Sequence, residues 1–245
     1  MHQSHEAFEE PKEKDIKIWR YMDFTKYISL LESRSLFFVR ADKLKDPFEG
    51  SYPRINIELR RQWFTERGFP VRAEELSVAY ERVRKFFFIN AWYMNDIENA
   101  AMWKLYLKTN EGVAIQSTLE HLKRSFDSNV EDTVFIGIVK YIDYDKTPLK
   151  EGNLFNPFLY KRRSFEHEHE LRAITECLRK IGPDWTNVVY ENGKYVPVNL
   201  ETLVDQVYVS PDAPKWFGDL VKAVTQKYKL QKSVLASDLA NRPLY

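Results

Sequence analysis

Residues 86–94 read FFFINAWYM and are apolar at both odd and even positions apart from Asn90. Successive side chains of a strand point to opposite faces, so an extended segment of this composition needs apolar surroundings on both faces. Continuous apolar runs of this kind are typical of strands in the interior of a sheet. The segment therefore predicts a central strand that is buried on both faces.

Periodicity and turn residues divide the rest of the chain into an irregular succession of strands and helices. Strands are predicted over 16–22, 35–40, 112–117, 134–144, 169–176, 205–210 and 233–237, and a hairpin over 186–200 around Asn192 and Gly193. Helices are predicted over 24–34, 53–67, 73–85, 97–108, 118–126, 154–165 and 214–229, with Asp23 and either Ser117 or Thr118 as N-caps.

This order of elements predicts an α+β fold with a central mixed or antiparallel sheet and surrounding helices. No linker or composition shift divides the chain, so we expect a single domain over residues 16–245. Residues 1–15 are polar, carry charges of both signs and lack periodicity, which predicts a frayed tail.

The 37 Lys and Arg residues nearly balance the 36 Asp and Glu residues, so the chain has no overall field that would draw it to nucleic acid or an anionic membrane. No apolar run approaches the roughly 18 residues of a membrane span, and the N-terminus lacks the apolar core of a signal peptide. The single cysteine, Cys177, cannot form an intrachain disulfide, which is typical of a reducing compartment. We therefore expect a cytoplasmic protein without a membrane partner.

Residues 164–175, SFEHEHELRAIT, concentrate acidic side chains before an apolar run. If the stretch is extended, Glu166, Glu168, Glu170 and Arg172 share one face of the strand. Three like charges on one face repel each other and are tolerated where water, a cation or a basic partner relieves them. The stretch is therefore either a solvated edge or a functional site.

Two neighbouring features allow further interpretations of this stretch. His167 and His169 could ligate a metal with a third ligand such as His121, although a pair of exposed or hydrogen-bonded imidazoles is the simpler alternative. The basic run at 161–163 could hold a phosphate, lie at a solvated helix end, or neutralise the neighbouring glutamates. No metal centre is predicted from this pattern alone.

The DPFEG segment at 46–50 places Asp46 and Glu49 in a loop that its proline restricts, which indicates a site, although a turn that caps the next helix is the alternative. Glycine-rich phosphate-binding signatures are absent from the chain, which argues against a Rossmann site or a P-loop.

An aromatic group is the other candidate feature for binding. Trp103 and Tyr106 share one side of a predicted helix, and with Trp92 and Tyr93 they could form a stacking wall for a base or a nicotinamide ring. Aromatic residues at this spacing more often pack in a core.

The motifs WRYM, DPFEG, AMWKLY, EGVAIQST and KRRSFEHEHELRAIT follow one another over roughly residues 16–175. In this order they resemble the bacterial family catalogued as domain of unknown function 2971, and the ordered set is more specific than any single motif. The resemblance implies a bacterial protein and, for some members, a phage-defence setting, but no agreed activity that could be transferred.

A more distant resemblance is to the mono-ADP-ribosyltransferases, which bind NAD in a split α+β sandwich. Arg20 stands in the place of their early-strand arginine, Ser117 and Thr118 in the place of their middle Ser-Thr element, and Glu168 and Glu170 in the place of their late Glu-x-Glu. The resemblance implies that Arg20 clamps a pyrophosphate and that Glu170 stabilises the oxocarbenium-like charge formed as nicotinamide leaves.

In this catalytic interpretation Glu170 and Glu168 are the catalytic residues. The substrate-binding residues are Arg20, Tyr21, Asp46, Glu49, Trp103, Tyr106, Ser117, Thr118 and Arg172. The middle element reads QST where the family has Ser-Thr-Ser, and Arg172 could instead form a salt bridge with the carboxylates. A Glu170→Gln variant is expected to lose NAD-dependent transfer or NAD hydrolysis with little change in melting temperature.

Three functions follow from these features. The first is an enzyme that acts on NAD or another nucleotide as substrate, with no firmly implied cofactor. The second is a non-catalytic binding or regulatory module in which Arg20, Asp46, Glu49 and the Glu-rich strand form a buried polar network. The third is a metal-dependent nuclease that uses Asp46, Glu49 and Glu168 as oxygen ligands.

Overall fold

The computed structural model describes residues 1–126, 132–178 and 190–243. Its strands are β1 (Lys17–Asp23), β2 (Ser35–Arg40), β3 (Phe87–Met94), β4 (Gly112–Thr118), β5 (Phe135–Ile138), β6 (Lys140–Ile142), β7 (Tyr160–Arg162), β8 (Glu170–Glu176), β9 (Gly193–Pro197), β10 (Gln206–Val209) and β11 (Ser233–Ala236). Its α-helices are α1 (Phe24–Ser33), α2 (Arg54–Glu66), α3 (Pro70–Val83), α4 (Ala100–Tyr106), α5 (Leu119–Ser125), α6 (Leu200–Leu203) and α7 (Lys215–Lys227).

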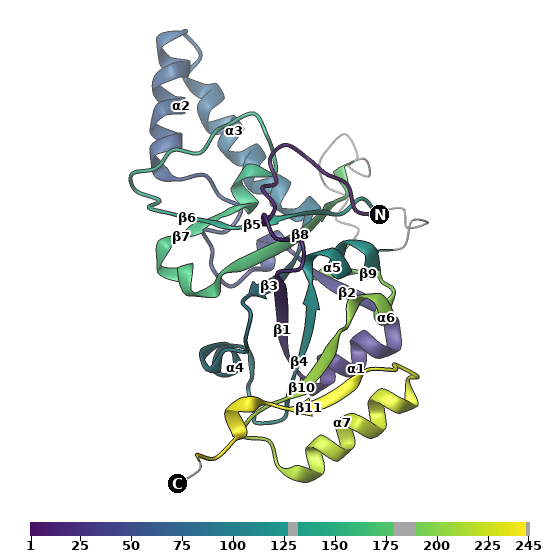
Figure 1. Cartoon of the computed structure of the whole chain (residues 1–245). Helices are drawn as coiled ribbons and strands as arrows, with labels where there is room; N and C mark the ends of the chain where they lie inside the picture. The colour runs from purple at the N-terminus through teal and green to yellow at the C-terminus, as the bar shows by residue number, and fades with distance from the viewer. Residues whose placement is uncertain (127–131, 179–189, 244–245) are drawn as a thin grey trace.

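The main sheet runs β11-β10-β4-β1-β3-β2-β9, and β8 and β5 join it through β3 (Figure 1). The pairs in this sheet are antiparallel except β10 with β11, which is parallel, so the sheet is mixed. A separate parallel pair joins β6 to β7. The predicted α+β fold with a central sheet is confirmed.

The sheet forks at β3. One edge of β3 pairs with β8 from Phe87 to Tyr93, while its other edge pairs with β2 at Phe88 and Ile89 and with β1 at Tyr93 and Met94. Because β1 and β2 separate here, residues 90–92 face the gap between these two strands. The backbone groups that point into the gap need partners other than a strand. Side chains bridge the gap: Arg20 Nη1 of β1 donates to Ala91 O at 2.5 Å, and the Asn90 amide donates to Phe37 O of β2 at 2.9 Å.

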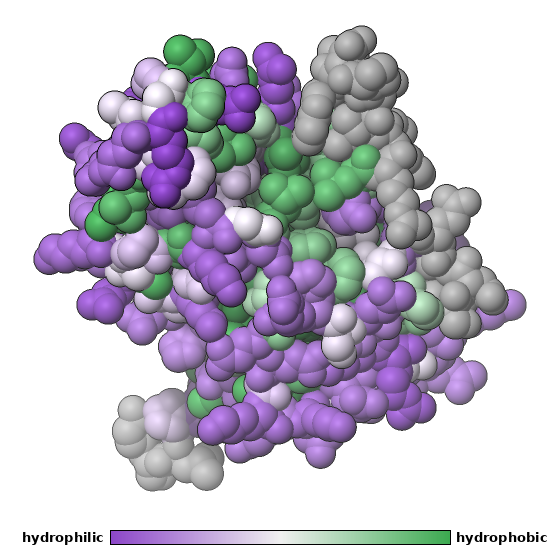
Figure 2. Space-filling model, turned by 90° about the horizontal axis from the view of Figure 1, so that it is seen from above, coloured by the Kyte–Doolittle hydropathy of each residue, from purple (hydrophilic) through white to green (hydrophobic). Residues whose placement is uncertain are grey.

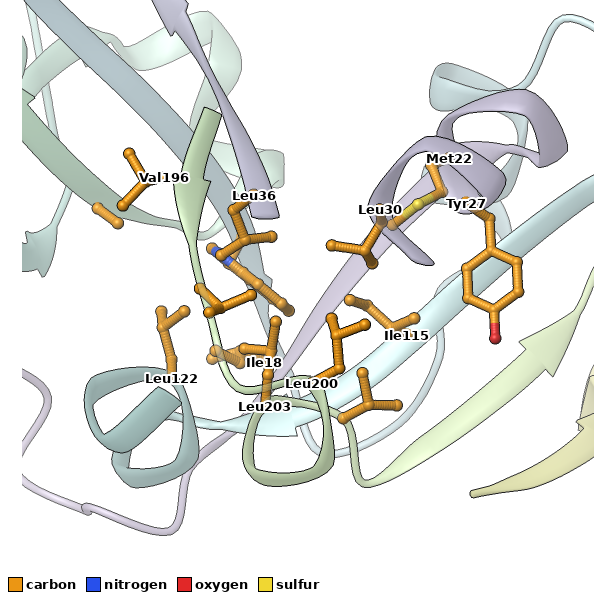
Figure 3. Close-up of a cluster of buried hydrophobic side chains, with 14 of the residues drawn as sticks. Ile18, Met22, Tyr27, Leu30, Leu36, Ile115, Leu122, Val196, Leu200 and Leu203 are labelled. Atoms are coloured by element: carbon orange, nitrogen blue, oxygen red, sulfur yellow. The ribbon is translucent and has the colours of Figure 1, made fainter. Parts of the chain in front are cut away.

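Apolar clusters cover both faces of β3, as its composition predicts. Phe88 and Trp92 belong to the largest cluster, on which β1, β2, β4, β9, α1, α5 and α6 converge (Figure 3). Phe87 and Ile89 point the other way, into a second cluster with Phe158. A third cluster, under α4, contains Trp19, Tyr21, Tyr93, Met102, Trp103 and Ala114.

One predicted strand is divided and one predicted helix is wrong, and tertiary contacts explain both. The predicted strand over 134–144 divides into β5 and β6 because the chain changes partners at Val139, whose N–H donates to Glu170 O, while Lys140 N–H donates to Leu159 O. The predicted helix over 154–165 is absent. Its residues form a 3-10 turn (Asn156–Phe158), strand β7 and the start of a longer 3-10 helix (Arg163–Glu168).

Several boundaries also differ from the predictions. Asn99 begins α4 later than expected because its side chain accepts hydrogen bonds from the N–H groups of Ala101 and Met102. Thr118 caps α5 as predicted, whereas Asp23 precedes α1 but accepts a hydrogen bond from the Lys108 N–H instead of capping it.

The predicted hairpin over 186–200 is only partly described. Its second half forms β9, which pairs with β2, and its first half falls mainly on residues 179–189, outside the described residues. The expectation of a frayed tail over residues 1–15 is corrected as well. Phe8 is buried in the second cluster, and the Gln3 N–H donates to Val134 O.

Helices α2 and α3 project from the body of the molecule as a hairpin (Figure 1). Seen from that end, the surface is mainly hydrophilic, with hydrophobic residues in small groups (Figure 2). Among the described residues, no helix combines the length and apolar character that crossing a membrane requires.

Candidate functional site

Five charged side chains from four segments meet on the face of β8 away from the largest apolar cluster. Glu49 comes from the loop before α2, Lys161 from β7, Glu168 from the end of the 3-10 helix, and Glu170 and Arg172 from β8. All five are buried. We call this group the buried ion cluster.

Arg172 is the centre of the buried ion cluster and is 1% exposed. Its Nε lies 2.7 Å from Glu170 Oε1, its Nη2 lies 3.2 Å from Glu170 Oε2, and its Nη1 donates to Phe158 O at 2.8 Å. Its Nη2 also donates to Glu49 Oε2. Burying a guanidinium is costly unless its donors are paired, and here each nitrogen has a partner.

Lys161 joins the three carboxylates of the cluster. Its Nζ lies 2.5 Å from Glu168 Oε2, 3.3 Å from Glu170 Oε2 and 3.4 Å from Glu49 Oε1. Its position depends on β7, since a strand turns Lys161 inward and leaves the neighbouring Arg162 half-buried. The expectation that the 161–163 run could neutralise the nearby glutamates is confirmed for Lys161, although it was not among the predicted site residues.

The three carboxylates outnumber the two cations, and the two carboxylates nearest Lys161 respond differently. Burial raises the pKa of Glu168 above its ordinary value, and the hydrogen bond from Lys161 offsets this only in part. Burial also acts to raise the pKa of Glu170, but the charges of Arg172 and then Lys161 outweigh it and lower that pKa. Glu168 is therefore the carboxyl group of this pair that gains a proton more readily.

This difference gives a pH-dependent effect on stability. Because the folded-state pKa of Glu168 lies above its ordinary value of 4.5, folding binds a proton there, and stability falls as pH rises through the folded-state pKa. Relative to a Glu168→Gln variant, the wild type should lose stability as pH rises above the ordinary value of 4.5 and through the folded-state pKa of Glu168, and the difference should then level off. Urea unfolding across that range measures the difference, and a difference that stays constant or grows in favour of the wild type would contradict the assignment.

Asp46 and Arg162 form a second ion pair beside the buried ion cluster. Arg162 Nη2 lies 2.9 Å and its Nε 3.2 Å from the two oxygens of Asp46. The guanidinium carbon lies 4.4 Å from the centroid of the Phe48 ring. Asp46 and Glu49 therefore attach both ends of the DPFEG loop to the segment around β7 and β8.

Arg20 lies near the cluster without an ion pair to it among the contacts of the described residues. Its hydrogen bond to Ala91 O supports the fork of the sheet. Burial lowers the pKa of Arg20 to about 10, while the charges of Tyr106 and Glu170 act to raise it, so Arg20 stays charged at neutral pH. The fold thus brings the early arginine and the late glutamate to the same region.

The predicted aromatic wall does not form. Trp92 packs in the largest apolar cluster, whereas Trp103, Tyr21 and Tyr93 pack in the third. The Trp103 indole donates to Glu98 Oε2 at 2.8 Å, and the Tyr21 hydroxyl accepts from the Asn99 N–H at 2.9 Å. The packing alternative therefore describes Trp103 and Tyr21, while Tyr106 is 40% exposed.

Ser117 and Thr118 have contacts at the end of β4. The Thr118 hydroxyl accepts from the His121 N–H at 3.1 Å, which starts α5, and Ser117 is fully buried opposite Ile18 of β1. The hydrogen bonds of these hydroxyls go to Thr118 O and come from the His121 N–H, and neither partner belongs to the buried ion cluster.

Most of the residues proposed as metal ligands are paired with other side chains. Among the described residues, no group of three or more His, Cys, Asp or Glu side chains is arranged to hold a metal ion. His121 instead lies 2.7 Å from Asp205, and His169 adopts a left-handed backbone conformation with φ 37° just before β8. The carboxylates of Asp46, Glu49 and Glu168, proposed as oxygen ligands, are paired with Arg162, Arg172 and Lys161.

A cavity of about 350 Å³ opens on the outer side of the DPFEG loop. Its lining combines residues of the loop region with residues of α2 and of a later turn, including two charged side chains: Pro47, Phe48, Ser51, Tyr52, Pro53, Arg54, Ile57, Tyr144 and Asp145. Asp46 and Glu49 of the same loop point to their cationic partners. The loop therefore has an ionic inner side and a largely apolar outer side, a division that the DPFEG motif alone does not reveal.

Comparisons of the chain with protein-family models, curated proteins and solved structures give no match.

Proposed function

We propose that the protein is a non-catalytic binding module. The buried ion cluster holds the DPFEG loop in place, and the outer side of that loop forms the ligand-binding surface. The observation that carries this proposal is the state of Glu170, which is 4% exposed and has both carboxylate oxygens bonded to Arg172 or Lys161.

A catalytic glutamate of the transferase type needs to face the charge that develops on the substrate. Glu170 faces Arg172 and Lys161 instead, and these contacts satisfy a buried carboxylate without a ligand. Glu168 is also buried and lies 2.5 Å from Lys161. This arrangement supports the structural role of the Glu-rich stretch.

The loop itself supports the binding role. Glu49 pairs with Arg172, and Asp46 pairs with Arg162, so the loop is held by residues more than a hundred positions later in the chain. A loop fixed in this way presents Phe48, Ser51 and Tyr52 to the cavity in a defined arrangement. Cavities of several hundred cubic ångströms with mainly apolar walls are typical of small-molecule sites.

An NAD-using enzyme is the second candidate. One observation favours it: Arg20 of β1 and Glu170 of β8 both adjoin β3, and each is close enough to affect the other electrostatically. The distant transferase resemblance requires this convergence. In that case NAD would have to displace Arg172 or Lys161 from Glu170.

The Glu170→Gln variant separates the two candidates. If Glu170 is structural, the variant leaves Arg172 with an incomplete set of charged partners and loses about 3 kcal/mol of stability. For a chain of this size such a loss lowers the melting temperature by on the order of 10 °C. Thermal unfolding with and without NAD measures this, and NAD should not stabilise the wild type.

The exposed neighbour Glu166 provides the matched control. Glu166→Gln removes the same charge from the same segment and should leave the melting temperature within about 1 °C, since surface substitutions change stability little. If Glu170→Gln keeps its melting temperature while the wild type hydrolyses NAD and the variant does not, the enzyme is the correct assignment.

A further inference from the structure

A second cavity, of about 180 Å³, lies between the DPFEG loop and the inner faces of α2 and α3. Its lining includes Gly50, Tyr52, Arg60, Tyr80, Glu81 and Arg84. Tyr52 lines both this cavity and the larger one, so the two adjoin each other across its ring. The volume is below the roughly 300–1,000 Å³ of sites for drug-sized ligands, so the cavity suits a small ligand or one end group of a larger one.

Arg60 forms one wall of this cavity, and each of its guanidinium nitrogens has a hydrogen-bond partner. Its Nε and Nη2 donate to Glu151 at 3.2 and 3.0 Å, and its Nη1 donates to Ser77 Oγ at 2.9 Å. Its guanidinium carbon also lies 4.9 Å from the centroid of the Tyr80 ring and 5.4 Å from that of Tyr52. These contacts fix Arg60 and neutralise its charge.

Arg84 is different. It follows the last residue of α3, its Nε is buried, and that nitrogen has no hydrogen-bond partner within the described part of the chain. Its guanidinium also forms no ion pair with any carboxylate that the structure describes. An unsatisfied buried donor is uncommon in native proteins. Arg84 also brings a positive charge without a paired carboxylate among the described residues to the wall of the cavity.

The DPFEG loop comes close to this guanidinium through a residue without a side chain. Gly50 has φ +74°, which favours glycine, and a Cβ there would lie 3.4 Å from Arg84 Nε and 2.5 Å from Phe158 Cε1. The loop therefore packs on Phe158, the residue whose carbonyl accepts from Arg172, and passes beside Arg84. The position of the cavity wall is linked in this way to the buried ion cluster.

We propose that this cavity binds the oxyanion group of a small ligand, a carboxylate or a phosphate, with Arg84 as the anchoring residue. The inference rests on the proposed binding function and specifies the ligand class. A guanidinium offers paired donors that match both oxyanions, and the rings of Tyr52 and Tyr80 provide an adjoining apolar wall. Glu81 is exposed and also lines the cavity, so its negative charge opposes a ligand of high negative charge.

The test titrates the full chain with inorganic phosphate and, separately, with benzoate, at constant ionic strength, and follows backbone amide NMR shifts. Both probes should shift resonances of the loop and of α3, and the tighter of the two identifies the oxyanion. Arg84→Gln should weaken binding at least tenfold, whereas Glu81→Gln should tighten it because a repelling charge is removed. The melting temperature of Arg84→Gln should not fall, since the variant removes an unsatisfied donor.

Arg82 is the matched control because it is exposed in the last turn of α3, two residues before Arg84, and its loss changes the net charge equally. Arg82→Gln should change the affinity by less than twofold. Equal weakening by both arginine variants would mean diffuse attraction, and an absence of shifts with either probe would mean no oxyanion site; either result overturns the inference. The phosphate and benzoate titrations depend neither on NAD nor on Glu170. Their failure would therefore overturn the oxyanion site alone, and the Glu170→Gln experiment would still decide the proposed function.

Discussion

Replacing Arg172 by methionine is expected to lower the free energy of unfolding by about 3–5 kcal/mol. The change removes the cation at the centre of the buried ion cluster and leaves the carboxylates of Glu49 and Glu170 buried with Lys161 as their remaining partner. Chemical denaturation followed by circular dichroism measures the loss. Arg163→Met is the control, because Arg163 is exposed on the neighbouring segment and should change stability by less than about 0.5 kcal/mol.

A double variant shows whether the loss arises from uncompensated charge. Combining Arg172→Met with Glu170→Leu removes the cation and its main partner together, so stability should recover relative to Arg172→Met alone. A double variant that is less stable than the single one by the full additive amount would show that the cation and the carboxylate act independently. That outcome would contradict the cluster as a coupled unit.

Truncating Trp92 to alanine is expected to cost about 3–5 kcal/mol. Trp92 is 2% exposed in the largest apolar cluster, and its indole N–H donates to Asn90 Oδ1 at 2.7 Å. The variant opens a cavity and leaves the Asn90 side chain with one partner fewer at the fork of the sheet. Trp63 is 50% exposed on α2, so Trp63→Ala should cost less than about 1 kcal/mol by the same measurement. Similar losses for both variants would contradict the central role of β3.

Periodicity predicted most of the sheet because the pattern of side-chain burial follows directly from local sequence. The apolar run of β3, the alternating residues of β1 and the amphipathic character of α7 each reflect the faces that they bury. The segment 154–165 shows where local periodicity fails to predict the structure. Its composition suits a helix, but extended structure at Lys161 places that ammonium among three carboxylates that come from other segments.

The sequence predicted several residues of the candidate site, but it did not predict how those residues pair in space. Glu170 and Arg172 share a strand face, as alternation requires, whereas Glu166 and Glu168 lie in a 3-10 helix where that alternation does not apply. The pairing of Glu49 with Arg172 joins residues 123 positions apart, and the local pattern around either residue does not indicate it. The unpaired Arg84 likewise becomes visible only when α3 and the DPFEG loop are placed together.

The pairing of β3 with β8 has a consequence for the order of folding. The edge of β3 that faces β8 pairs with residues 170–176, so β3 cannot complete its hydrogen bonds until most of the chain has been synthesised. Domains dominated by such distant pairings fold slowly, because loop closure must precede the contacts that reward it. The carboxylates of the DPFEG loop can likewise reach their partners, Arg162 and Arg172, only after β7 and β8 have emerged from the ribosome.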